Sequence, residues 1–151
     1  RVEGCKKAID ATGGAVELIG MDYNDDNSAT AAEQTSAVLA ANPDLGGIFG
    51  ANLFSAQGAA QAVQNAGLSG VVKVAYFDAP PSAVEDLKAG LNDMVIAQHP
   101  YEMGQKCIEF AVAAINGDTA SIPKRWGTGY TVITRDNVDT EEAQNSIYST
   151  Q

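Results

Sequence analysis

The sequence predicts an α/β domain in which a parallel sheet is flanked by helices. Short apolar runs typical of buried strands alternate with longer segments whose apolar residues recur at helical spacing. The connections between them are short, and such alternation is typical of a parallel sheet covered by helices. The length of 151 residues, with 45% hydrophobic and 19% charged residues, is that of an ordinary globular domain.

The first half of the chain contains an opening helix and two strand–helix units. The Gly13-Gly14 pair ends the opening helix, and Asn42-Pro43 ends the next one. Between them, an acidic loop offers Asp26, Asn27 or Ser28 as a helix cap. The predicted elements are a helix over 1–12, a strand over 15–20, a helix over 28–41, a strand over 46–50 and a helix over 54–66.

The second half continues the alternation. The apolar run VVKVAYF predicts a buried strand, Pro100 precedes a long helix, and Glu141 and Glu142 favour the positive end of a last helix. The predicted elements are a strand over 71–77, a helix over 82–88, a strand over 93–97, a helix over 101–116, a strand over 128–134 and a helix over 140–148.

The charge balance excludes several classes of partner. Nine basic against nineteen acidic side chains give a formal charge of −10, whereas binding to nucleic acid or to an anionic membrane needs clustered Lys and Arg. No apolar run approaches the ~18–20 residues that cross a bilayer, so no direct membrane insertion is expected. The sequence opens without a charged and apolar leader, so any signal peptide is expected to lie outside it.

Polar and aromatic side chains follow several of the predicted strands. Sheets of this kind bind ligands in the crevice beyond the carboxyl ends of their strands. The residues at those ends include Tyr23, Asn52, Phe54, Asp78 and Gln98. Amides donate and accept hydrogen bonds, a carboxylate accepts from two neighbouring hydroxyls, and an aromatic face covers the C–H side of a sugar ring. We therefore predict a site for a pentose, a hexose or a polyol.

Motifs for cofactor binding and covalent catalysis are missing from the sequence. It has no G-x-x-x-x-G-K-[ST] phosphate loop and no G-x-S-x-G elbow, and WGTGYT does not complete the dinucleotide fingerprint. The single histidine, His99, has no evident triad partner, and we interpret it as a structural or solvent-facing imidazole. We therefore expect no cofactor and no enzymatic activity.

The two cysteines and the acidic loop each admit a structural and a functional interpretation. Cys5 and Cys107 lie in apolar helical patterns and are interpreted as buried free thiols, with a disulfide as the alternative. The acidic loop partly matches an EF-hand calcium loop, but Gly is missing where the sharp turn needs it, so a helix-capping loop is favoured over a metal site. The matching residues are Asp22, Asn24, Asp26, Thr30 and Glu33.

Several segments in a fixed order carry a resemblance to a known family. NPDLGGIFGANLFSAQGAAQAVQNAG, VKVAYFDAPPSAVEDLKAGLNDMVIAQHPYEMG, the closing TVITRDNVD and the opening RVEGCKKAI resemble the sugar-binding proteins of ABC transporters, of the ribose-binding type. The resemblance covers nearly the whole chain. It implies one lobe of a type I periplasmic binding protein, in the periplasm or, in a Gram-positive organism, anchored outside the cell as a lipoprotein.

The resemblance also implies which residues hold the sugar. The family's sugar-binding Asn of the AN motif, Asp of the FD motif and Gln of the AQ motif match Asn52, Asp78 and Gln98, the same residues that the strand ends indicate. Their structural alternatives are a helix cap, a turn cap and a solvated hinge residue. Tyr23 and Asp26 are weaker candidates, because loops vary at that place.

The resemblance further implies that the chain corresponds to about half of a family member. The first lobe has no counterpart in it, nor has the strand that opens the second lobe and lies between the strands matching 15–20 and 46–50. We therefore divide the chain into a sugar-binding lobe (1–98), a segment that crosses to the first lobe (99–125), and a return strand with the terminal helix (126–151).

This division leaves an apolar stripe on the crossing helix without a partner. We expect a fragment whose gap is filled by the first half of its own chain or by a dimer mate. The stripe comprises Met103, Cys107, Phe110, Ala111 and Ala114.

The leading interpretation is a receptor lobe that delivers a sugar or polyol to the permease of an ABC transporter. The alternative is the effector-binding domain of a transcription regulator of the lactose-repressor type, which shares this fold. The wording IAQHPYEMG favours the transport receptor. A third class, an α/β enzyme such as a hydrolase, lacks a nucleophile–base pair.

Overall fold

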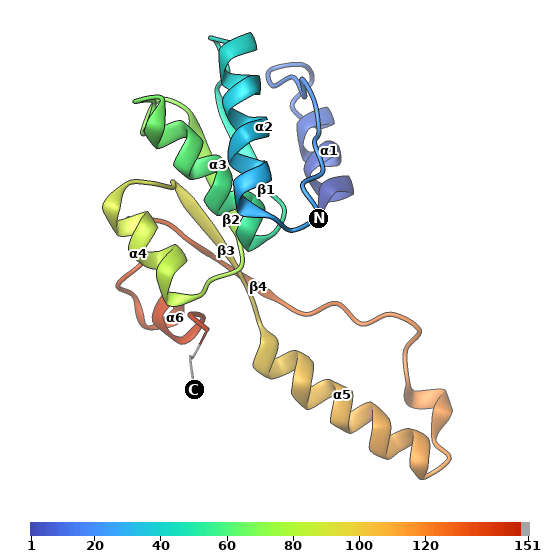
Figure 1. The fold of residues 1–151 in the computed structure, drawn as a ribbon. Helices are drawn as coiled ribbons and strands as arrows, with labels where there is room; N and C mark the ends of the chain where they lie inside the picture. The colour runs from blue at the N-terminus through green and yellow to red at the C-terminus, as the bar shows by residue number, and fades with distance from the viewer. Residues whose placement is uncertain (149–151) are drawn as a thin grey trace.

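A computed structural model describes residues 1–148 of the chain. Its centre is a four-stranded sheet of β1 (Gly47–Gly50), β2 (Lys73–Phe77), β3 (Met94–Gln98) and β4 (Tyr130–Ile133), in that order (Figure 1). The predicted sheet flanked by helices is confirmed. It is not wholly parallel, because β4 runs antiparallel to β3. The chain leaves the carboxyl end of β3 and later returns to that same end, where Tyr130 pairs with Gln98. The returning strand β4 therefore has to run in the opposite direction.

Helices follow or precede the strands close to the predicted places. Local signals set several of their ends. The side chain of Asn27 accepts hydrogen bonds from the backbone nitrogens of Ala29 and Thr30, and Pro81 and Pro100 open two helices. The bounds are α1 (Val2–Asp10), α2 (Ser28–Ala41), α3 (Leu53–Asn65), α4 (Pro81–Ala89), α5 (Pro100–Ile115), the 3-10 helix η1 (Thr119–Ser121) and α6 (Glu141–Asn145).

One face of the sheet carries the core. Alternate strand residues on it are buried against apolar residues of α3, α4 and α6, and α2 packs on the outer side of α3. Gly58 allows that approach, because a Cβ at this position would lie 2.6 Å from the Cβ of Ala31 on α2. The large buried side chains and the alanine of the strands on this face are Val74, Tyr76, Val95, Ala97 and Ile133, and Gly50 and Thr131 are buried as well.

The opposite face of the sheet is only partly covered. Phe49 and Phe77 on this face are half-buried, and their rings meet edge to face with centroids 6.4 Å apart. Helix α1 contributes no buried residue. Among residues 1–148, no helix is both long and apolar enough to cross a membrane.

The strand predicted over 15–20 is wrong. This segment is irregular and exposed throughout. A strand forms only when its backbone pairs with a neighbour, and β1 is an edge strand of the described sheet, with β2 as its partner. The strand that the resemblance places between 15–20 and β1 has no counterpart in residues 1–148. The backbone of residues 15–20 therefore has no neighbouring strand to pair with.

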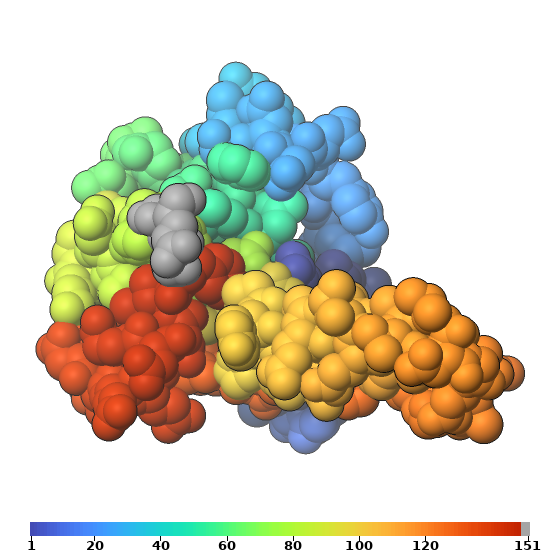
Figure 2. All heavy atoms as spheres, turned by 90° about the horizontal axis from the view of Figure 1, so that it is seen from below, coloured from blue at the N-terminus to red at the C-terminus, as the bar shows by residue number. Residues whose placement is uncertain are grey.

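Helix α5 extends away from the sheet, and the chain returns along it to β4 (Figures 1 and 2). Phe110, predicted to lack a partner within the chain, instead contacts Trp126 on the returning limb, with the rings edge to face and their centroids 6.2 Å apart. Other apolar side chains of α5 are left in solvent: Ile108 is 67% exposed and Ile115 is 82% exposed.

Asp93, just before β3, is bonded to β2 and to the segment that follows β4. Its Oδ2 accepts a hydrogen bond from the backbone nitrogen of Val74 at 3.1 Å, and its Oδ1 lies 2.8 Å from Arg135 and 3.3 Å from Lys73. Burial acts to raise the pKa of Asp93, but the hydrogen bonds from Arg135, Val74 and Lys73 outweigh it and hold the pKa below its usual value.

We predict that Asp93→Asn lowers the free energy of unfolding by about 1–2 kcal/mol at pH 7, because it removes a carboxylate that accepts charged hydrogen bonds. The folded-state pKa is depressed, so this stabilisation is present above the unfolded value of about 3.9 and is lost as the pH falls through the folded value. Urea unfolding at pH 7 and pH 3 checks this, with Asp44→Asn in an exposed turn as the control. An equal difference at both pH values contradicts it.

Candidate functional site

Asp78 lies directly after β2 with a left-handed backbone, at φ +80°. This conformation is uncommon for a residue other than glycine, although Asp adopts it more readily than most. Its Oδ1 accepts hydrogen bonds from Nε2 of Gln98, the last residue of β3, and from the hydroxyl of Tyr148 at 3.1 Å. These two donors fix the carboxylate in place, and neither of them uses Oδ2.

Asn52 follows β1 and caps α3. Its Oδ1 accepts a hydrogen bond from the backbone nitrogen of Ser55 at 2.8 Å, and its own backbone is extended. The structural alternative of a helix cap is therefore present. The cap uses only Oδ1, so the Nδ2 group is a further donor that it does not consume.

Asn52 and Asp78 line one hollow of about 310 Å³ at the carboxyl edge of the parallel strands. Gln98 joins them through its hydrogen bond to Asp78. The structure thus brings together the three strand-end residues that the sequence singled out. Polar and apolar side chains share the wall, and the other lining residues are Asp26, Leu53, Phe54, Pro80 and Tyr148.

Sequence reasoning missed Tyr148 and Arg1. Tyr148 lines the hollow, and its backbone nitrogen donates to the carbonyl of Ala79 at 2.9 Å. The Arg1 guanidinium lies 3.9 Å from the centroid of the Phe77 ring and donates to the carbonyl of Ala51 at 2.9 Å, so it stands at the same edge of the sheet. Both residues reach the site from opposite ends of the sequence, and no local pattern marks either of them.

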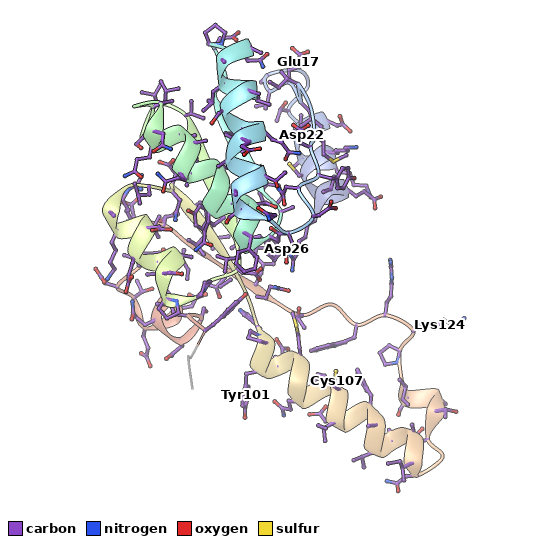
Figure 3. All side chains as sticks on the ribbon, viewed as in Figure 1. Glu17, Asp22, Asp26, Tyr101, Cys107 and Lys124 are labelled. Atoms are coloured by element: carbon purple, nitrogen blue, oxygen red, sulfur yellow. The ribbon has the colours of Figure 1, made fainter. Side chains whose placement is uncertain are left out.

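The acidic loop contributes Asp26 to the hollow and does not bring Tyr23 there. Tyr23 is 73% exposed. Asp22 lies along the loop beside α1, whereas Asp26 lies at the start of α2 (Figure 3). The Asn24 amide donates to the hydroxyl of Ser55 at 2.9 Å. Within residues 1–148, no group of three or more His, Cys, Asp or Glu side chains is arranged to hold a metal ion.

His99 is packed at the point where the chain leaves β3. Its Nε2 lies 3.0 Å from the hydroxyl of Thr131 on β4, and its Nδ1 lies 3.4 Å from Glu102 in the first turn of α5. A Cβ on Gly129 would lie 2.9 Å from the imidazole ring, so the return strand passes close to it. These contacts favour the structural interpretation of this histidine.

Both cysteines are free thiols, as the favoured interpretation has it. Cys5 is half-buried on α1. The predicted burial is wrong for both: Cys5 is only partly covered because α1 buries none of its residues, and Cys107 is exposed on α5, which extends away from the sheet.

The fold and the site together define one lobe of an α/β solute-binding protein, with polar residues after two strands lining a hollow and a third strand-end residue hydrogen-bonded to one of them. The periplasmic binding protein domain family matches residues 1–119, and the chain belongs to that family. The family consists of sugar-binding transport receptors and is not a family of enzymes.

Individual relatives agree with this assignment. The chain is 33% identical over 99 residues to the D-allose-binding periplasmic protein of Escherichia coli, covering 66% of this chain and 32% of the relative. It is 36% identical over 81 residues to the ribose import binding protein of Salmonella typhimurium, covering 54% and 27%. The resemblance to the ribose-binding type is confirmed.

A solved structure covers almost all of the chain. An ABC transporter solute-binding protein from Agrobacterium vitis, bound with α-D-tagatopyranose, superposes with a TM-score of 0.90 at 45% identity. The match covers 98% of this chain and 49% of that one. The chain thus spans about half of this relative, and about a third or less of the two curated ones.

We predict that Asn52→Ala lowers the free energy of unfolding by about 1 kcal/mol, because α3 loses its cap. Asn52→Ser retains a capping oxygen and is expected to unfold within a few tenths of a kcal/mol of the unsubstituted chain. Chemical denaturation of the two variants checks this. Equal stability of the Ala and Ser variants would show that the cap contributes nothing.

Proposed function

We propose that this chain is the sugar-binding lobe of a receptor that delivers a sugar or polyol to the permease of an ABC transporter. The observation that carries the proposal is that Asn52 and Asp78, after two strands, line one hollow, and that Gln98, at the end of a third, is hydrogen-bonded to Asp78. The relatives named above are described as binding allose, ribose and tagatose, which supports a monosaccharide as the ligand.

The proposed mechanism is binding by hydrogen bonds, without a catalytic step. Asp78 accepts from sugar hydroxyls through Oδ2, and Asn52 donates through Nδ2. Arg1 adds a guanidinium with several donors at the same edge, and Phe54 supplies apolar surface for the C–H side of the ring. His99 is engaged by Thr131 and Glu102, so we assign it no acid–base role and propose that the chain is not an enzyme.

The family assignment also supports a location and a partner. Receptors of this kind work outside the cytoplasmic membrane, so we place the protein in the periplasm or on the outer side of that membrane, with an ABC permease as its partner. The transport receptors among its relatives favour this role over the repressor alternative. No finding supports the repressor.

We predict that the full-length gene product binds at least one of D-tagatose, D-allose and D-ribose in isothermal titration. Asp78→Asn is expected to weaken binding by about 10- to 100-fold, because a neutral amide replaces a carboxylate that accepts charge-assisted hydrogen bonds. Asn52→Ser is expected to weaken binding about tenfold while keeping the helix cap.

Asp44→Asn and Asn65→Ser are the matched controls for this titration. Both residues are exposed, in the turn before β1 and at the end of α3 respectively, and both variants should bind like the unsubstituted protein. Failure of the unsubstituted protein to bind any pentose, hexose or polyol overturns the proposed function.

We also propose a division of the chain into three parts. Residues 1–98 form the sugar-binding lobe, residues 99–125 cross to a second lobe in the intact receptor, and residues 126–151 form the return strand and the terminal helix. Residues 149–151 of the last part lie outside the described residues. The support is the exposed apolar side of α5, where Ile108, Val112 and Ile115 are all more than half exposed. Exposing such an apolar surface to water is unfavourable, and a surface of this kind marks a contact with another lobe or another protein chain.

We predict that residues 1–151, purified alone, associate into dimers or larger species, because a second copy covers the apolar side of α5. Analytical ultracentrifugation checks this, and replacing Ile108 and Val112 together by Lys should shift the population toward the monomer. A monodisperse monomer with one cooperative unfolding transition would contradict the crossing-segment proposal.

A further inference from the structure

The hydroxyl of Tyr148 connects two of the proposed sugar-binding residues. It donates to Oδ1 of Asp78 at 3.1 Å and accepts from the backbone nitrogen of Gln98 at 3.0 Å. The Gln98 side chain donates to the same Oδ1. The backbone nitrogen of Tyr148 donates to the carbonyl of Ala79 at 2.9 Å, which fixes the tyrosine beside the turn that carries Asp78.

This arrangement requires the phenol to keep its proton. Burial raises the pKa of Tyr148, and the neighbouring carboxylate of Asp78 raises it further. The backbone groups of Gln98 and Ala79 act to lower it, but the net change is upward. At neutral pH the hydroxyl therefore donates to Asp78 and accepts from Gln98 at the same time.

We propose that Tyr148 is a positioning residue for the sugar: its hydroxyl holds Asp78 and Gln98 at the spacing that sugar hydroxyls need. This inference rests on the proposed function. With Oδ1 held by two donors, the carboxylate does not have to be ordered when the ligand arrives, and its second oxygen is left for the sugar. Groups fixed in advance bind more tightly because they lose less freedom on binding. The C-terminal segment thereby becomes part of the binding site.

The test is Tyr148→Phe in the full-length gene product, which keeps the ring and removes the hydroxyl. Tyr130→Phe is the control, because Tyr130 lies on β4 and is 69% exposed. The Kd for D-tagatose, or for whichever sugar of the panel binds most tightly, is expected to rise about tenfold in Tyr148→Phe and to stay unchanged in the control. In the sugar-free protein, the backbone amide of Gln98 should exchange its hydrogen several-fold faster in Tyr148→Phe, because the hydroxyl that accepted its hydrogen bond is gone.

The possible outcomes separate this inference from the proposed function. A tyrosine with a purely structural role would lower the unfolding temperature and leave the Kd of the folded protein unchanged, and that result overturns the inference alone. An unchanged exchange rate at Gln98 also overturns it. If the unsubstituted protein binds no sugar, the proposed function is overturned and this inference with it, before any variant is made.

Discussion

The carboxylate of Asp78 is the group on which the rest of the site depends. It follows the central parallel strand, and one of its oxygens receives donors from the next strand, through Gln98, and from the C-terminal segment, through Tyr148. A partly buried carboxylate is stable only when hydrogen-bond donors replace the water it has lost. The two hydrogen bonds that Asp78 needs therefore also hold three distant segments of the chain together beside the hollow.

Much of this arrangement follows from local sequence signals. Asn27, Pro81 and Pro100 fix helix starts, and the short apolar runs at β1, β2 and β3 predict these three strands. Once consecutive strands connected by helices are taken as parallel, their carboxyl ends must share one edge. The approach of Asn52 to Asp78 in the fold is thus a consequence of connectivity, and residue type adds the chemistry.

The features that sequence reasoning missed depend on contacts between distant segments. The segment 15–20 has the composition of a strand, but a strand forms only by hydrogen bonding to a neighbouring strand. Among residues 1–148, no strand pairs with this segment. The direction of β4 depends on where the chain returns after α5. Tyr148 and Arg1 come to the site only through the fold, and the sequence around each of them gives no sign of it.

The position of Gln98 links the site to the rest of the proposed receptor. Gln98 ends β3, α5 begins two residues later, and His99 between them contacts both Thr131 of the return strand and Glu102 of α5. A ligand bound at the proposed site would therefore lie beside the place where both connecting limbs meet the sheet. A closing movement of two lobes changes the backbone most at such a place. In the proposed receptor, the binding residue Gln98 and this junction are therefore neighbours in the chain.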